Sequence, residues 1–373
     1  MTPPASFNPS RLTWARRRRG LTKTHLARAI GVELRSVTAY ESGEFSPEPD
    51  RLRKLAEALR FPEAFFAGDD LEEPALDTAS FRSLSKMTAR QRDTALGSGA
   101  IALLLNEWIE ARFTLPEPKL PDLGRDANPE SAAEAVRRDW ALGELPIKNM
   151  VHLLEAHGAR VYSLALDTAE VDAFSMWRQD RAFVFLNTLK SAEHARFDTA
   201  HELGHLVLHR HAAPNGQQAE QDANAFASAF LMPAASVRAH APRFATLDQL
   251  IRLKKIWGVS VAAITYRLHR LGLLTDWHYR KLYIELSTRG YRKAEPDGGM
   301  RETSQILQKV FAALRADGVT KNAVADALHV HPGDVDELVF GLALTGIDGS
   351  ATPRLQGDRL GPRLTVVGSG TGS

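Results

Sequence analysis

The sequence contains no cysteine among its 373 residues. This absence excludes disulfide bridges and thiolate metal ligands, and it is compatible with a reducing compartment. Any metal site in this chain must therefore be built from histidine and carboxylate side chains.

Targeting and membrane-spanning segments are also missing. The first residues lack the charged and apolar blocks of a secretory signal, and the longest apolar run, Ala100 to Leu105, is far too short to span a bilayer. We therefore expect a soluble, cytoplasmic protein with no membrane partner. The hydrophobic content of 44% and the charged content of 25% are typical of globular proteins, and the length suggests two or three domains.

The net charge of +2 is small, but the charges are unevenly distributed. Residues 131–242 are mildly acidic, whereas residues 243–293 contain many more Lys and Arg than Asp and Glu. A basic segment of this kind suits phosphate or an acidic partner, although scattered cations on helices more often only solvate a surface.

The strongest chemical signal is a His-Glu-x-x-His motif formed by His201, Glu202 and His205. Apolar residues around it recur at helical spacing, which predicts a packed helix with both imidazoles on one face, one turn apart. Two such histidines can bind one ion, and Glu202, turned roughly 100° around the axis, can reach a water at that ion. The motif indicates a Zn²⁺ site for metal-assisted hydrolysis.

A hydrolytic zinc site normally has three protein ligands and leaves the fourth position for water. Residues 219–233 predict a second helix, and Glu220 lies in its first turn beside the apolar stripe. If the two helices pack together, Glu220 completes a His-His-Glu site.

Three other residues compete for this position: His209, His211 and Asp222. His211 gives the three-histidine spacing of the metzincins, but that pattern requires a glycine where this chain has Leu208. Glu220 is therefore the favoured third ligand.

These features together resemble the ImmA/IrrE family of cytosolic metallopeptidases over about residues 130–290. The resemblance implies that His201, His205 and Glu220 bind zinc and that Glu202 is the general base. The family cleaves repressors of the helix-turn-helix type, so it also implies a repressor or antitoxin-like protein substrate. The residues that carry the resemblance are the motif, Arg196–Ala200, Leu208, His209, Glu220, Asn224, Phe226, Ala227 and Phe230–Pro233.

Residues 9–67 predict a bundle of short helices whose ends are marked by glycines, with helix-turn-helix spacing. This module resembles the Xre-type DNA-binding domain of phage repressors. In that family the third helix enters the major groove. The alternative is a repressor-like fold kept for protein contacts. The resemblance assigns base reading to Leu34, Arg35, Ser36 and Thr38, and phosphate contacts to Lys23 and the run Arg16–Arg19.

The remaining segments are predicted from composition and periodicity. Residues 68–125 form a connector with an acidic linker and a packing helix over 88–112. Residues 126–242 form the peptidase domain, in which strands at 160–165, 172–177 and 182–186 predict an antiparallel sheet that holds an extended substrate. Residues 243–293 predict a second helix-turn-helix-like pair of helices. Its function is DNA contact, docking of the repressor substrate, or bracing of the peptidase domain, and bracing is the default expectation.

Residues 294–345 predict further helices, and the Gly- and Ser-rich residues 346–373 predict a disordered tail. The expected fold class is α+β and mostly helical: an N-terminal helix-turn-helix bundle, a zincin-like domain with a small antiparallel sheet, and a helical C-terminal region. The expected function is a zinc-dependent endopeptidase fused to a DNA-binding domain. The alternative is a transcription regulator whose zinc site is structural or senses metal. The oligomeric state is open, and a homodimer is compatible with the sequence.

Overall fold

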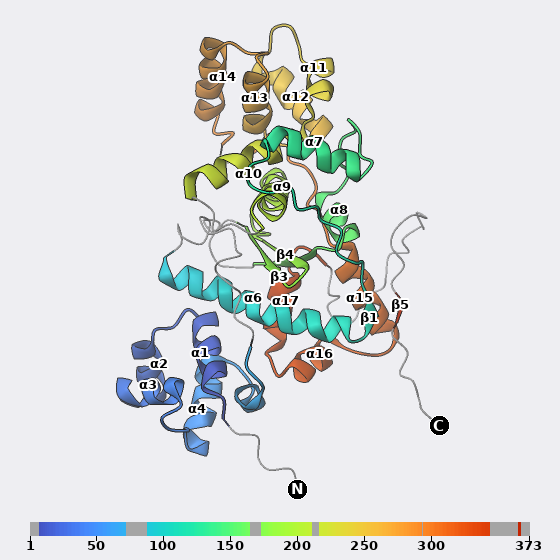
Figure 1. Ribbon diagram of the computed structural model, residues 1–373. Helices are drawn as coiled ribbons and strands as arrows, with labels where there is room; N and C mark the ends of the chain where they lie inside the picture. The colour runs from blue at the N-terminus through green and yellow to red at the C-terminus, as the bar shows by residue number, and fades with distance from the viewer. Residues whose placement is uncertain are drawn as a thin grey trace.

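The computed structural model describes residues 7–71, 88–164, 173–210, 216–292, 294–343 and 365–366. These residues are mostly helical and contain small sheets, which confirms the predicted fold class. The N-terminal helices lie at one end of the molecule, α12–α14 lie at the opposite end, and α9 and α10 lie between them (Figure 1).

The helices of the first half are α1 (Pro9–Arg18), α2 (Lys23–Ile30), α3 (Leu34–Ser42), α4 (Pro49–Leu59), the 3-10 helix η1 (Glu63–Ala67), α6 (Ala89–Glu110), α7 (Pro129–Asp139) and α8 (Met150–Ala156). Those of the second half are α9 (Ala192–Leu208), α10 (Gly216–Leu231), α11 (Ala234–His240), α12 (Leu247–Trp257), α13 (Val261–Arg270), α14 (Asp276–Thr288), α15 (Gln305–Ala316), α16 (Lys321–Leu328) and α17 (Pro332–Val339). The strands are β1 (Phe113–Thr114), β2 (Arg160–Ser163), β3 (Phe174–Arg178), β4 (Arg181–Leu186) and β5 (Thr365–Val366).

The N-terminal bundle follows local sequence signals. Thr22 caps α2 by accepting a hydrogen bond from the backbone N–H of His25, and α2 and α3 end at Gly31 and Gly43 with φ of 68° and 76°. Glycine adopts this left-handed conformation without steric cost, which is why it ends both helices. The helix-turn-helix arrangement therefore has a direct origin in the sequence.

Helix α6 connects this bundle to the rest of the molecule. It begins with a capping box between Thr88 and Gln91, and most of its residues beyond Thr94 are buried. It packs against α1, α16 and α17. A Cβ atom added to Gly97 would lie 2.7 Å from the Cα atom of Arg18, so the absence of a side chain lets the two helices approach closely. The predicted packing role of this helix agrees with these contacts.

The main sheet has the strand order β2-β4-β3. Strands β3 and β4 form an antiparallel hairpin through Gln179 and Asp180, as predicted, but β2 pairs with β4 in parallel. The prediction of an all-antiparallel sheet is wrong at this pair. Strand periodicity tells which residues are buried but not the direction of the neighbouring strand, and β4 returns between β2 and β3. All four residues of β2 are buried, as is typical of a parallel strand covered on both faces.

Helices cover the sheet from both sides. Helix α9 packs against β3 and β4 and α17 packs against β2, and Figure 1 shows α9 on one side of the sheet with α6 and α17 on the other. The short strand β1 pairs with β5, whose two residues are the described part of the predicted disordered tail.

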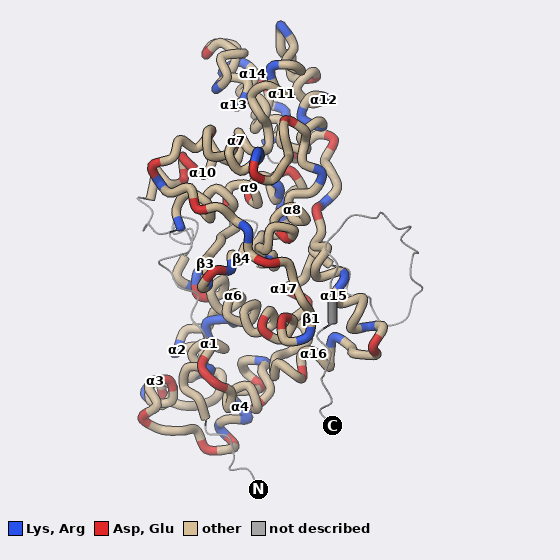
Figure 2. The backbone as a smooth tube through the Cα atoms, turned by 45° about the vertical axis from the view of Figure 1, so that its right-hand side comes forward, with Lys and Arg blue, Asp and Glu red and all other residues tan. Residues whose placement is uncertain are grey.

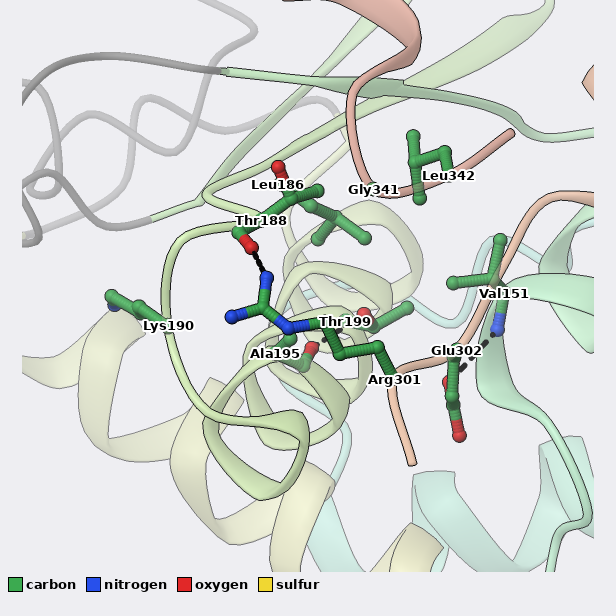
Figure 3. Close-up of a pocket in the computed structure, with 10 residues that line it drawn as sticks. All are labelled: Val151, Leu186, Thr188, Lys190, Ala195, Thr199, Arg301, Glu302, Gly341 and Leu342. Carbon is green, nitrogen blue, oxygen red and sulfur yellow. Dashed lines mark hydrogen bonds between the residues drawn. The ribbon is translucent and has the colours of Figure 1, made fainter. Parts of the chain in front are cut away.

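The segment between α14 and α15 runs along the first turns of α8 and α9. The carboxylate of Glu302 accepts hydrogen bonds from the backbone N–H groups of Met150 (2.9 Å) and Val151 (3.3 Å) and pairs with Arg196. Figure 3 shows Glu302 beside Val151, and it shows Arg301 donating to the carbonyl group of Thr188. Glu302 thus caps α8, and the C-terminal region is part of the packing of the peptidase domain.

A second carboxylate, that of Glu155 on α8, binds the start of α15. Glu155 is 2% exposed and accepts hydrogen bonds from the Ser304 hydroxyl and from the backbone N–H groups of Gln305 (2.8 Å) and Ile306 (3.1 Å). Burial raises the pKa of Glu155 to about 7, although these hydrogen bonds oppose the rise. Glu155 caps α15 from α8.

Buried ion pairs join the two ends of the chain. Arg19 donates two hydrogen bonds to the carboxylate of Asp334 on α17, at 2.6 and 2.8 Å. Arg18 lies 3.3 Å from the same carboxylate and also pairs with Glu337. Asp334 is 2% exposed, so the N-terminal bundle is held against the C-terminal helices by contacts that solvent screens little.

The second helix-turn-helix-like pair is α12 and α13. The second helix of this pair, α13, is packed rather than free: Arg267 is 2% exposed, donates to the carbonyl group of Met232 (3.0 Å) and pairs with Glu130 (2.8 Å). These contacts fix one side of α13 to the end of α10 and the start of α7, while Tyr266 and Arg270 on the same helix are exposed. Of the three alternatives for this pair, the contacts favour bracing.

Figure 2 shows Lys and Arg interspersed with Asp and Glu along the whole molecule. Within the described ranges, no helix combines the length and the apolar character needed to cross a membrane.

Candidate metal centre and DNA-binding surface

The two motif histidines lie on α9, which packs closely against α10. A Cβ atom added to Gly204 would lie 3.1 Å from both the Cα atom of Ala223 and the Cδ1 atom of Phe226, so a larger residue would push the helices apart. The glycine inside the motif therefore sets the distance between the helix that carries the histidines and the helix that carries Glu220.

The structure brings His201, His205 and Glu220 together. The Nε2 atoms of the two histidines are 3.0 Å apart, and the carboxylate oxygens of Glu220 lie 3.4 Å from His205 Nε2 and 3.8 Å from His201 Nε2. Ligands of a tetrahedral zinc ion, at about 2.0–2.2 Å from the metal, are about 3.3 Å from one another. The donor set and its spacing fit Zn²⁺. In the part of the chain that the structure describes, no other three His, Asp or Glu side chains meet in this way.

The competing ligands have other positions. His209 lies behind His205, with 3.2 Å between their Nδ1 atoms, and burial together with His205 lowers the pKa of His209 to about 4. Asp222 accepts a hydrogen bond from Gln218 on the same helix. His211 lies outside the described residues. The geometry therefore favours Glu220 over His209 and Asp222.

Polar neighbours orient the motif residues. The Nδ1 atom of His201 is 3.1 Å from the Oδ1 atom of Asn224 on α10, which leaves Nε2 directed toward the other ligands. The Ser175 hydroxyl on β3 donates to the Oε2 atom of Glu202 at 2.6 Å. Glu202 is 1% exposed, so this contact holds a buried carboxylate in one orientation.

Ser175 is not among the site residues predicted from the sequence. The signal for it is a hydroxyl in a strand whose other residues are mainly apolar, because a buried hydroxyl needs a hydrogen-bond partner. Its partner, 27 residues away along the chain, is not predictable from that signal alone.

The predicted base-reading residues lie on α3, and three of the four are exposed. The Arg35 side chain is 85% exposed and lies 2.9 Å from Glu33, and Leu34 is 48% exposed. Thr38 is exposed and Ser36 is half-buried. Lys23, at the start of α2, lies 3.2 Å from the carboxylate of Glu41.

The assignment of the whole run Arg16–Arg19 to phosphate contacts is wrong. Arg16 is buried and pairs with Glu41 at 2.5 Å, while Arg18 and Arg19 pair with Asp334. Arginines in one run of a helix point in different directions, and three of these four point into the protein.

Comparison with known families fits this geometry. Residues 154–269 match the model described as the IrrE N-terminal-like domain, which is peptidase family M78, and residues 12–66 match the helix-turn-helix model. A search among curated proteins finds no match to the chain. The first segment contains the complete His-His-Glu cluster and Glu202, and the second contains α3.

The matches confirm the resemblance seen in the sequence. The chain contains a metallopeptidase-type domain of the IrrE kind and an N-terminal helix-turn-helix domain of the kind that binds DNA.

Proposed function

We propose that this protein is a cytoplasmic zinc-dependent endopeptidase that cleaves a helix-turn-helix repressor or an antitoxin-like partner and thereby derepresses genes. The observation that carries the proposal is the meeting of His201, His205 and Glu220 beside the buried carboxylate of Glu202. These three side chains would hold Zn²⁺, which supplies a Lewis acid that acidifies water and polarises a peptide carbonyl.

The residues of the chain have separate tasks in this reaction. Glu202, oriented by Ser175, accepts a proton from the attacking water and donates it to the leaving amine. Asn224 accepts a hydrogen bond from His201 Nδ1–H, so that the unprotonated Nε2 atom faces the metal position. Strand β3 is an outer strand of the described sheet and packs against α9, so an extended substrate backbone can add alongside it.

The N-terminal domain is proposed to bind duplex DNA through α3, with Leu34, Arg35, Ser36 and Thr38 toward the bases and Lys23 toward a phosphate. Because the pairs with Asp334 occupy Arg18 and Arg19, the salt dependence of binding should report fewer phosphate contacts than the number of arginines in α1 suggests.

The function is tested by incubating the full-length protein with the repressor encoded nearest to its gene. A single cut that requires zinc and is abolished by a chelator supports the proposal. Tight zinc binding without any cut, over a panel of helix-turn-helix repressors, would instead support a regulator with a structural or sensing zinc site.

A further inference from the structure

A cleft separate from the metal centre lies between α7, the end of α10 and α11. Its volume is about 490 Å³, within the range of about 300–1,000 Å³ that is typical of pockets for small organic ligands. Its charged lining consists of Arg137, Arg138, Arg238, Arg267, Glu134 and Glu144. None of these side chains belongs to the proposed catalytic machinery.

Two buried arginines fix the walls of the cleft. Arg137 is 3% exposed, and its three nitrogens donate to the carbonyl groups of Gly143 (2.8 Å), Leu145 (2.6 Å) and Phe230 (2.6 Å). It therefore ties the loop after α7 to the end of α10. Arg267 donates in the same way to the carbonyl group of Met232, two residues further along that segment. A cleft with walls fixed by such bonds is formed before a ligand arrives.

Two further arginines line the cleft and are not engaged in ion pairs with the described residues. Arg138 on α7 and Arg238 on α11 are exposed, and neither forms an ion pair with any residue that the structure describes. Burial lowers the pKa of Arg137, and the nearby carboxylate of Glu144 partly opposes this effect. Glu130 compensates the charge of Arg267, and the other charged side chains of the lining are three arginines and two glutamates, so the charge balance of the cleft is positive.

The remaining wall is apolar, with Ala229, Pro233 and Ala234 among its residues. The cleft thus offers guanidinium groups, which match the oxygens of a phosphate group in pairs, next to a surface suited to an uncharged organic part. We propose that this cleft binds a small phosphorylated organic molecule of sugar-phosphate or nucleotide size, with the phosphate group at Arg138 and Arg238. Glu220 lies near the start of α10 and Asn224 in its middle, while Ala229 near its end lines the cleft, so this ligand contacts the helix that holds part of the metal centre.

Calorimetric titration of the full-length protein tests the proposal with three probes: adenosine monophosphate, ribose 5-phosphate and inorganic phosphate. At least one of the two organic phosphates should bind saturably, with one molecule per chain, and more tightly than inorganic phosphate. The double variant Arg138→Ala/Arg238→Ala should weaken that binding by about tenfold or more, because two charge-assisted contacts are lost.

The matched control is Arg243→Ala, which removes an exposed arginine that lies just beyond α11 and outside the cleft lining; it should leave binding unchanged. Arg138 and Arg238 are both exposed, so the melting temperature of the double variant should stay near that of the wild type. The proposal is overturned if neither organic phosphate binds saturably, if inorganic phosphate binds as tightly, or if the double variant keeps the wild-type affinity.

Discussion

Removal of the carboxylate of Asp334 should destabilise the junction between the two ends of the chain. Asp334 is 2% exposed and forms ion pairs with both Arg18 and Arg19. Loss of one partner of a buried ion pair typically costs about 3–5 kcal/mol, because the other charge stays buried without compensation. Arg18 retains Glu337 and the Arg19 side chain is 20% exposed, so we expect Asp334→Ala to cost about 3 kcal/mol.

The matched control is Asp336→Ala on the same helix. Asp336 pairs with Lys321 at 2.7 Å, but the two side chains are 42% and 32% exposed, and a pair of this kind contributes about 0–1 kcal/mol. Urea unfolding measures both costs, and hydrogen exchange at residues 9–18 and 332–339 shows whether the loss is located at the junction. Equal costs for the two variants, or unchanged exchange in α1 after Asp334→Ala, would refute this account of the junction.

Four further predictions concern the metal centre, the DNA surface and pH. Glu202→Gln should retain zinc but lose cleavage, because an amide cannot accept the proton; zinc analysis and a cleavage assay check this. Glu220→Ala should weaken zinc binding strongly while His211→Ala leaves it nearly unchanged, as measured by competition with a chelator. If Arg35 reads a guanine, Arg35→Ala should relax the base preference at one position by about 1–3 kcal/mol; if Arg35 contacts a phosphate, the variant should weaken binding to all DNA sequences alike. Because the pKa of Glu155 is raised from 4.5 to about 7, its contribution to the free energy of unfolding is greatest below pH 4.5 and is lost as the pH rises to about 7; Glu155→Gln should remove this part of the pH dependence of urea unfolding.

Local features of the fold could be predicted because their causes are local. The glycines that end α2 and α3 are followed by the predicted turns, and the four-residue spacing of His201 and His205 places both on one face of α9. The position of Glu220 could also be anticipated, since an apolar stripe on each helix implies that the two helices pack together.

Features that depend on distant contacts were not predictable in the same way. The direction of β2 depends on where β4 returns, and the role of Ser175 depends on a contact with Glu202 across the sheet and helix layers. The run Arg16–Arg19 looked like a phosphate-binding surface because nothing near it in the sequence supplies the carboxylate that Arg18 and Arg19 pair with in the fold.

The pairing of Arg19 with Asp334 also has a consequence for the order of events during synthesis. The two residues are 315 positions apart, so the first helix of the protein leaves the ribosome long before its partner exists. At about 5–20 residues per second, this interval is roughly 15–60 s. During that time Arg18 and Arg19 have no carboxylate from α17 and are open to cellular polyanions. A chain that stops before α17 keeps this surface permanently exposed, so a truncated product should bind nucleic acid less selectively than the complete protein.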